Sequence, residues 1–396
     1  MHVLDILEQR GFVKQSTDQD ALRKALDDGP LTFYVGFDPT GDCLHVGHLV
    51  PVMVIRWLQE AGHRPIIVLG GGTAMVGDPS GKDKTREMIS AETIQHNLEA
   101  QRAQFGRFLD LSKAEVVNNA DWLMGLEYVT FLRDIGRHFS VNKMLSAEGV
   151  RQRLDRNQGL SFIEFNYHLL QSFDFLKLNE TYGCSLQVGG DDQWFHILGG
   201  VDLIRRVNGG EAHGLTVPLL TRADGKKMGK TETGAVWIDA ERFSPYDYYQ
   251  YWVNVHDADV GRFLRMYTVL PIEEIVKLEA LDGADIRKAK QVLAFEATKL
   301  AHGEQEATAA QQSAKKVFGG AGIADEMPTH QVAFPIPVFE VLADSGLCKS
   351  RGAARRLIQQ GGARIGDTRV TDVHAMLDGP AVVWAGKKRA VRVEQK

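Results

Sequence analysis

The chain has 396 residues, more than one compact core normally holds, so two or three domains are expected. An apolar content of 44%, a charged content of 24% and a net charge of −5 are typical of a globular protein and argue against a uniformly basic nucleic-acid binder. No apolar stretch reaches membrane-spanning length, the first residues lack a signal-peptide pattern, and the scattered Cys43, Cys184 and Cys348 indicate reduced thiols. We therefore expect a cytoplasmic protein without a membrane partner.

The first structured region predicts a phosphate-binding turn. Residues 31–35 predict a strand, residues 36–41 a turn-rich loop, and residues 49–58 carry apolar side chains at helical spacing. Unpaired N–H groups and the dipole at the start of such a helix attract phosphate. His45 and His48 stand at this start, so their imidazoles are expected on one side of the first turn. Two satisfied polar side chains are the structural alternative, and a metal site is disfavoured because no nearby cysteine or carboxylate completes a zinc-like ligand set.

Further strands alternate with helical stretches up to about residue 220. Residues 65–69, 114–117 and 185–188 predict strands, and two of these runs lead into polar or glycine-rich turns at 70–72 and 189–193. Such alternation implies a parallel sheet covered on both faces, with ligands at the carboxyl ends of the strands. The predicted fold class is α/β, a Rossmann-like doubly wound parallel sheet followed by an α-helical domain and a small α+β domain.

A second motif, Lys227-Met228-Gly229-Lys230-Thr231, places two lysines three residues apart. A loop of this kind is usually a solvated turn, but paired lysines also suit a polyphosphate. Its combination with the histidine pair, in this order and within one α/β pattern, is more specific than either motif. Together they indicate nucleotide activation of a small molecule.

The end of the chain differs in charge from the rest. Ser244 and Pro245 predict a helix start, and helical patterning continues to about residue 318. Glycines and prolines between 319 and 337 indicate a linker. From residue 336 onward eleven Lys and Arg stand against six Asp and Glu, so this tail carries +5 and the remainder −10. A basic tail on an acidic body predicts a polyanionic partner.

These motifs resemble those of the bacterial tyrosine–tRNA ligases, which are class I aminoacyl-tRNA synthetases, and the resemblance covers essentially the whole chain. Residues 45–48 are similar to the family's His-Ile-Gly-His signature, residues 227–231 to its Lys-Met-Ser-Lys-Ser loop, and the tail to an S4 RNA-binding domain. Val46 and Gly229 depart from that pattern, and Gly229 removes a hydroxyl and adds backbone freedom. The resemblance implies a catalytic domain at 1–222, a signature loop and α-helical domain at 223–320, a linker at 321–335 and an S4-like RNA-binding domain at 336–396.

The resemblance implies a two-step reaction. The carboxylate of L-tyrosine attacks the α-phosphate of ATP to give tyrosyl-adenylate and pyrophosphate, and the 3′-terminal ribose of tRNA(Tyr) then takes the tyrosyl group. Because the nucleophile is already ionised, alignment and charge stabilisation on the departing pyrophosphate should dominate catalysis. Mg²⁺ is expected on the ATP phosphates without a dedicated protein site. The residues expected to act in catalysis are His45, His48, Lys82, Arg86, Lys227, Lys230 and Thr231.

The resemblance also implies a pocket that recognises a phenol. Tyr34 and Asp174 match the family pair that contacts the tyrosine hydroxyl, although a helix with its polar side in water is the structural alternative for Asp174. The residues expected around tyrosine are Tyr34, Thr73, Asp78, Asn119, Tyr167, Gln171, Asp174 and Gln193. Those expected around ATP are Gly36, Asp38, Thr40, His45, Gly47, His48, Asp192, Gln193 and Lys230.

The basic helix of the tail is expected to bind RNA phosphates and an unpaired loop. Its RNA-binding residues are expected to be Lys349, Arg351, Arg355 and Arg356. The family is homodimeric and residues 131–145 match its interface, so a homodimer is expected.

Three other functions remain open from the sequence. The tryptophan-specific relative shares the fold and both phosphate motifs, but Tyr34, Asp174 and the S4-like tail argue against it. An RNA-binding or splicing-assistance protein on an inactive synthetase body conflicts with the intact histidine and lysine motifs. A small-molecule adenylate-forming enzyme would leave the basic tail unexplained.

Overall fold

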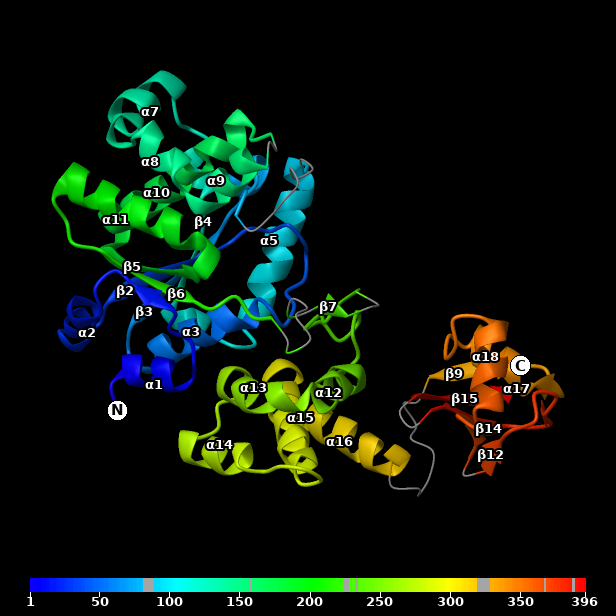
Figure 1. The fold of residues 1–396 in the computed structure, drawn as a ribbon. Coiled ribbons are helices and arrows are strands. Elements are labelled where there is room, and N and C mark those ends of the chain that lie inside the picture. Colours follow the sequence, from blue (N-terminus) through cyan, green and yellow to red (C-terminus); the bar gives the residue numbers. More distant parts are fainter. Residues whose placement is uncertain are drawn as a thin grey trace. The chain divides into compact units, whose positions relative to one another are not determined.

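The computed structural model describes residues 1–80, 89–156, 159–221, 223, 228, 230–231, 234–318, 328–366, 368–386 and 389–396. It separates into two compact units, Met1–Glu304 and Gln305–Lys396, whose elements are labelled in Figure 1.

The first unit is built on a six-stranded sheet with the strand order β1-β6-β5-β2-β3-β4. In that order the strands are Gln15–Ser16, His213–Val217, Cys184–Gly190, Thr32–Phe37, Arg64–Leu69 and Glu115–Asn118. Every neighbouring pair is parallel except β1 and β6. The predicted parallel α/β sheet is confirmed. The antiparallel edge strand β1 has only two residues, too few to leave a periodic pattern in the sequence.

Helices cover both faces of this sheet. The helices of the first unit are α1 (Val3–Gln9), α2 (Gln19–Asp27), α3 (Leu49–Glu60), α4 (Thr73–Val76), α5 (Ala91–Phe105), α6 (Ala120–Leu123), α7 (Tyr128–Asp134), α8 (Val141–Leu145), α9 (Glu148–Asp155), α10 (Phe162–Tyr182), α11 (Trp194–Asn208), α12 (Pro245–Val253), α13 (Val260–Tyr267), α14 (Ile272–Glu279) and α15 (Ile286–His302). The last four, α12 to α15, pack mainly on one another rather than on the sheet. Figure 1 shows α3 on the opposite side of the sheet from α10 and α11, which pack against each other. The carboxyl ends of the central strands are thereby left open between the two layers.

The long helix α10 begins and ends where its sequence dictates. Ser161 accepts a hydrogen bond from the backbone N–H of Glu164, and the Glu164 carboxylate accepts one from the backbone N–H of Ser161, which completes a capping box. Gly183 ends the helix in the left-handed conformation, with φ of 65°. Arg153 of α9 binds the buried Glu164 at 3.0 Å, so α9 is held against the start of α10.

The second unit contains α16 (Glu304–Phe318), α17 (Val338–Asp344) and α18 (Arg351–Gln359). Its five-stranded sheet has the order β12-β11-β14-β15-β9, with bounds Thr368–Val370, Ala363–Ile365, Ala381–Ala385, Arg389–Gln395 and Thr329–Val332, and β10 (Ile336–Pro337) pairs separately with β13 (Met376–Leu377). Apolar residues of α17, α18 and this sheet form one buried cluster that includes Val341, Ile358 and Val383. The predicted small α+β domain is confirmed, while its predicted boundaries remain predictions.

A buried arginine joins α1 and α3 to the helical part of the first unit. Arg10 is only 3% exposed, and its guanidinium lies over the Trp57 ring, 4.1 Å from the centroid. It donates to the backbone carbonyls of Arg265, Thr268 and Leu270 at 2.9, 2.9 and 2.5 Å. These three carbonyls lie at and just beyond the end of α13, so one charged side chain satisfies helix-end acceptors that have no intrahelical partner.

Replacing Arg10 by methionine leaves these carbonyls without their donors while keeping most of the side-chain volume. We expect the free energy of unfolding in urea to fall by about 3 kcal/mol. The matched control is Arg23→Met, since Arg23 forms a solvent-accessible ion pair with Asp5 whose loss should cost far less than the loss of Arg10. Equal losses in the two variants would contradict the role given to Arg10.

Candidate active site

A cavity of about 320 Å³ opens at the carboxyl ends of β2, β3 and β5. It collects most of the residues that the sequence predicts for tyrosine and ATP. The predicted residues that line it are Tyr34, Gly36, Asp38, Thr40, Gly47, His48, Thr73, Asp78, Asn119, Tyr167, Gln171, Asp174, Asp192 and Gln193. The rule that ligands meet the strand ends of a doubly wound sheet explains why positions so far apart in sequence converge here.

The histidine motif forms a tight turn immediately before α3. The imidazoles of His45 and His48 stack with 3.9 Å between their centroids, and His48 lines the cavity. His48 Nδ1 accepts from the backbone N–H of His45 at 3.2 Å, and His45 Nδ1 accepts from that of Gly47 at 3.0 Å. Burial, with a smaller contribution from His45, lowers the pKa of His48 to about 3. His48 is therefore neutral, with its proton on Nε2, where it can donate a hydrogen bond to a ligand.

The segment that follows the second motif lies beside the first motif. The backbone N–H of Val46 donates to Val236 at 3.0 Å and that of Ile238 to Leu44 at 3.1 Å, so the chain after the lysine motif runs antiparallel to the histidine turn. A Cβ at Gly47 would lie 3.5 Å from the Met228 carbonyl oxygen and 2.8 Å from the His45 ring. A side chain at position 47 would therefore displace the His45 ring, while the Met228 carbonyl lies at ordinary contact distance from this turn.

Part of the predicted catalytic set lies outside the described residues. This applies to Lys82, Arg86 and Lys227, and also to Gly229. Lys230 and Thr231 form the short strand β7 (Lys230–Thr231), which pairs with β8 (Gly234–Ala235), and the description covers their backbone only.

A buried carboxylate stands at the inner end of the cavity. Asp174 of α10 is 3% exposed, and its two oxygens accept from Asn119 Nδ2 at 2.9 Å and Trp122 Nε1 at 2.7 Å. Burial raises the pKa of Asp174 to about 7, although these two hydrogen bonds oppose the shift. Tyr34 of β2 is 2% exposed, and its hydroxyl has no hydrogen-bond partner among the described residues. An unsatisfied buried hydroxyl at a cavity wall is a feature that a polar ligand can satisfy.

A chain of hydrogen bonds connects this carboxylate to Asp38 and Tyr167, which also line the cavity. Asn119 Nδ2 also donates to Thr73 Oγ1 at 3.0 Å, and the Thr73 hydroxyl donates to Asp38 Oδ1 at 2.8 Å. The Tyr167 hydroxyl donates to the second Asp38 oxygen at 3.3 Å. A Cβ at Gly70 would lie 2.2 Å from Asp38 Oδ1, so only glycine at this position permits the contact between Asp38 and Thr73.

Asp78 forms a second acidic position on the cavity wall. Its Oδ1 accepts from the backbone N–H of Ser80 at 2.8 Å, and its Oδ2 accepts from Gln193 Nε2 at 3.0 Å. Gln171 of α10 lines the same cavity, as does Asp192. Tyr167, Gln171 and Asp174 were predicted to share one face of a helix, and all three lie on α10 and line the cavity.

Three polar residues of this site are absent from the set predicted from sequence. Trp122 donates to Asp174, and both Gln101 and Gln187 line the cavity. Gln187 is 2% exposed, and no described residue bonds its Oε1. A glutamine inside the otherwise apolar β5 was a usable signal for Gln187, because a buried polar side chain needs a partner. Nothing in the local sequence distinguishes Trp122 or Gln101.

The predicted RNA-binding residues lie in the second unit, within α18 and just before it. Ser350 caps this helix, and Lys349, Arg351, Arg355 and Arg356 are all exposed while Ala354 and Ile358 are buried. The Arg355 guanidinium lies 4.2 Å from the Phe339 ring centroid, and Arg351 forms ion pairs with Glu340 and Asp344. The basic side of α18 therefore faces outward from its own unit.

The described part of the chain contains no group of three His, Cys, Asp or Glu side chains arranged to hold a metal ion. Among the helices of that same part, none is long and apolar enough to cross a bilayer.

Comparisons with known proteins agree across the chain. The family of tRNA synthetases class I (W and Y) matches residues 26–319, and the S4 domain matches residues 337–382. The chain is 50% identical to tyrosine–tRNA ligase 1 of Clostridium acetobutylicum over 99% of both proteins, and 49% identical to the tyrosine–tRNA ligase of Clostridium beijerinckii over the full length of both. The crystal structure of a C-terminally truncated mitochondrial tyrosyl-tRNA synthetase from Aspergillus nidulans superposes with a TM-score of 0.72 at 31% identity, covering 80% of this chain and 94% of that one.

The raised pKa of Asp174 predicts a pH-dependent stability. Between about pH 4, where an ordinary carboxyl group titrates, and about pH 7 the folded protein retains a proton that the unfolded chain has lost, so this group makes stability fall as pH rises through that window. Buried histidines such as His48, whose pKa is lowered, contribute in the opposite direction, so the prediction concerns the difference between the two proteins. We expect the slope of stability against pH in this window to be more positive in Asp174→Asn than in the wild type, whatever the absolute stability of the variant. Thermal unfolding of the ligand-free protein across the window measures it.

Asp202→Asn is the control for this titration. Burial alone would raise the pKa of Asp202, but hydrogen bonds from Arg205 and Arg206 bring it below its ordinary value. Its titration therefore lies outside the window, and the variant should keep the wild-type slope. A wild-type slope in Asp174→Asn would contradict the prediction.

Proposed function

The chain belongs to the tyrosine–tRNA ligases of the class I tRNA synthetases, and we propose that the cavity at its strand ends is where tyrosine and ATP react. The protein activates L-tyrosine with ATP and charges tRNA(Tyr) with the tyrosyl group. Its similarity to tyrosine–tRNA ligases at about half identity over the full length disfavours the tryptophan-specific and the adenylate-forming alternatives. The roles of individual residues in this reaction are part of the proposal.

The proposal rests on two groups that line the same buried pocket, the Asp174 carboxylate and the Tyr34 hydroxyl, which has no hydrogen-bond partner among the described residues. A phenol can donate its proton to Asp174 and accept from Tyr34, because a carboxylate that already accepts two N–H groups has lone pairs left. Phenylalanine would leave both groups unpaired and buried. Tyrosine–tRNA ligases are the established example of such rejection, with a discrimination against phenylalanine of about 10⁵-fold.

The rest of the amino acid would extend toward the cavity mouth. Asp78, Tyr167 and Gln171 would hold the α-ammonium group, because an anionic carboxylate flanked by neutral acceptors suits a cation. Thr73, Asn119 and Gln193 would support them through the hydrogen bonds to Asp38, Asp174 and Asp78. In this arrangement the tyrosine carboxylate faces the histidine turn.

ATP would occupy the part of the cavity next to α3. A Cβ built at Gly36 meets nothing within 4 Å, which leaves room for the nucleotide to approach β2. Gly47 and the start of α3 suit phosphates, while Asp38, Thr40, Asp192 and Gln193 offer groups to the amino group, the phosphates and the ribose hydroxyls. Pro51 also borders this space, early in α3, where its missing N–H costs little.

Catalysis would depend on positioning and on charge. His48 Nε2–H, with His45 stacked on it, would donate to the phosphates as negative charge develops on pyrophosphate. Lys227, Lys230 and Thr231 would act from the neighbouring motif, with Lys82 and Arg86 as further cations. Mg²⁺ would be carried mainly by the phosphates and would supply additional charge neutralisation.

The protein would act as a homodimer in the cytoplasm. Several large apolar side chains on and near α7, α8 and the start of α10 are exposed in the single chain, and such a concentration within one part of the sequence suits an interface. They include Met124, Tyr128, Val129, Val141 and Phe162, all more than half exposed. The exposed basic side of α18 would bind tRNA phosphates.

Amino-acid-dependent ATP–pyrophosphate exchange, run with all twenty amino acids, tests the activity and the pocket. We expect exchange with tyrosine alone in the wild type, and Asp174→Ala should lose most of its preference for tyrosine over phenylalanine because the phenol loses its acceptor. Exchange driven by tryptophan would reject the substrate. Unchanged selectivity in Asp174→Ala would remove this residue from the pocket.

Removing residues 336–396 tests the role of the S4 domain. The shortened protein should keep tyrosine-dependent exchange, since every residue of the cavity lies in the first unit, but charge tRNA(Tyr) at least about tenfold less efficiently as phosphate contacts are lost. Quantification of tyrosyl-tRNA at increasing tRNA concentration measures this. Equal charging by both proteins would refute RNA binding by the tail.

A further inference from the structure

Two buried histidines lie beside the proposed ammonium site and have no role in the mechanism so far. His168 of α10 and His196 of α11 are each 6% exposed, and their Nδ1 atoms are 3.1 Å apart. His196 Nε2 is 3.0 Å from the Ser80 hydroxyl and 3.8 Å from Asp78 Oδ1. A line of polar contacts thus runs from the helix pair to the carboxylate proposed to bind the amino group of tyrosine.

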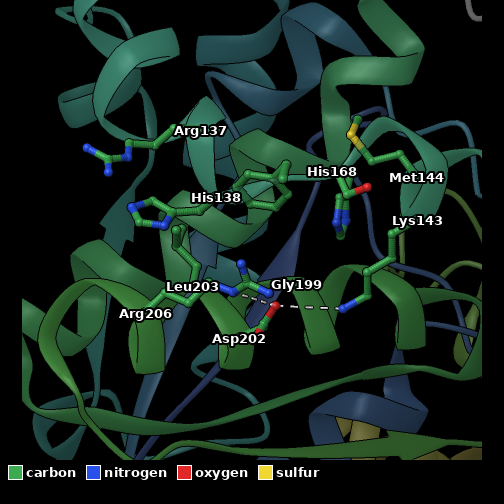
Figure 2. Close-up of a pocket in the computed structure, with 11 residues that line it drawn as sticks. Arg137, His138, Lys143, Met144, His168, Gly199, Asp202, Leu203 and Arg206 are labelled. Carbon is green, nitrogen blue, oxygen red and sulfur yellow. Dashed lines mark hydrogen bonds and ion pairs between the residues drawn. The ribbon is translucent and has the colours of Figure 1, made fainter.

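Both rings are tightly held. The His168 ring lies 4.2 Å from the Phe195 ring centroid and meets the Phe139 ring edge-on at 5.3 Å. A Cβ at Gly199 would lie 2.3 Å from His168 Cε1, so α11 can approach the ring only because this residue is glycine. Figure 2 shows His168 between Met144 and the Gly199 turn of α11. The His196 ring is itself 5.4 Å from the ring of Tyr167, another residue of the proposed ammonium site.

The hydrogen bonds select one arrangement of protons. Burial lowers the pKa of His196 and brings that of His168 to about 2, so each neutral ring carries one N–H. If His196 Nδ1 donated to His168, the proton of His168 would lie on Nε2, for which no described residue serves as acceptor. In the alternative arrangement the proton of each ring has an acceptor: His168 Nδ1–H donates to His196 Nδ1, and His196 Nε2–H donates to Ser80 Oγ and points toward the Asp78 carboxylate.

This arrangement orients Asp78 through contacts with residues next to it. Ser80 donates its backbone N–H to Asp78 Oδ1 while its hydroxyl is held by His196. Gln193, which donates to the other Asp78 oxygen, directly precedes α11, the helix that carries His196. Both oxygens of Asp78 are therefore oriented by groups anchored on the start of one helix.

We propose that His196, oriented by His168, is a positioning residue that holds Asp78 through Ser80 and thereby sets the affinity for the α-ammonium group of tyrosine. The inference rests on the proposed role of Asp78. Simple core filling does not explain the pair, because two buried imidazoles cost more to desolvate than apolar side chains of the same volume unless their hydrogen bonds are used.

The test replaces His196 by Asn or by Gln, because the side-chain amide of each residue can take the place of one imidazole nitrogen. Asn reproduces the position of Nδ1 and Gln that of Nε2, so His196→Asn loses the contact with Ser80 and His196→Gln keeps it. In tyrosine-dependent ATP–pyrophosphate exchange with the full-length protein, we expect His196→Asn and Ser80→Ala each to raise the KM for tyrosine about tenfold, corresponding to one lost hydrogen bond of the network, with the KM for ATP unchanged within about twofold. His196→Gln should restore the KM for tyrosine.

Two measurements separate positioning from a general loss of packing. Tyrosine without its amino group, 3-(4-hydroxyphenyl)propanoate, should inhibit His196→Asn as well as it inhibits the wild type, because it does not use the ammonium site. The double variant should be no worse than either single variant, since both break the same contact. His213→Asn, which alters another buried histidine, is the control for losing a buried ring and should leave both KM values unchanged.

The outcomes distinguish this inference from the function it rests on. If Asp78→Asn raises the KM for tyrosine but His196→Asn and Ser80→Ala do not, the positioning role is overturned and the ammonium site stands. If Asp78→Asn leaves that KM unchanged, the ammonium site and the positioning role are both wrong. Parallel increases in the KM values for tyrosine and ATP and in the inhibition constant of the deaminated analogue would also overturn the positioning role, because they indicate a distorted cavity.

Discussion

The contact between Asn119 and Asp174 is the constraint on which the site depends. It joins the end of β4 to the middle of α10 across the inner end of the cavity, and it leaves the Asp174 carboxylate buried with two N–H donors. A carboxylate in such surroundings is costly unless each oxygen is satisfied, so the neighbouring Thr73, Asp38 and Tyr167 are ordered in turn. Within the part of the chain described, three buried polar atoms at the pocket lack a hydrogen-bond partner: the Tyr34 hydroxyl and the Oε1 atoms of Gln101 and Gln187. The proposed recognition of a phenol uses the Tyr34 hydroxyl together with the Asp174 carboxylate.

The fold and most of the cavity could be predicted because both follow from repeated patterns. Short apolar runs that alternate with amphipathic stretches predict parallel strands, and parallel strands bring their carboxyl ends together. Residues such as Asp38, Asp78 and Gln193 could therefore be placed near one another from the sequence. The family resemblance then named the ligand that each of them should meet.

Contacts between side chains of separate elements could not be predicted, because no repeated pattern in the sequence relates one element to the other. Trp122 donates to Asp174 from a four-residue helix, and Arg10 reaches carbonyls more than 250 residues away in the chain. The contact between His168 and His196 could not be predicted for the same reason. The two residues belong to different helices and come together only when α10 and α11 pack. The identity of a side chain predicts which kinds of group it can hydrogen-bond, but tertiary packing determines which residue is its partner.

Gly199 illustrates how the affinity for a substrate can depend on a residue that does not line the cavity. A single methyl group at this position would push against the His168 ring, and the displacement would pass through His196 and Ser80 before it reached Asp78. Selection for tight capture of the amino acid would then act on the spacing of two helices. Some variants that weaken tyrosine binding are accordingly expected among positions that a survey of the cavity lining would classify as mere packing.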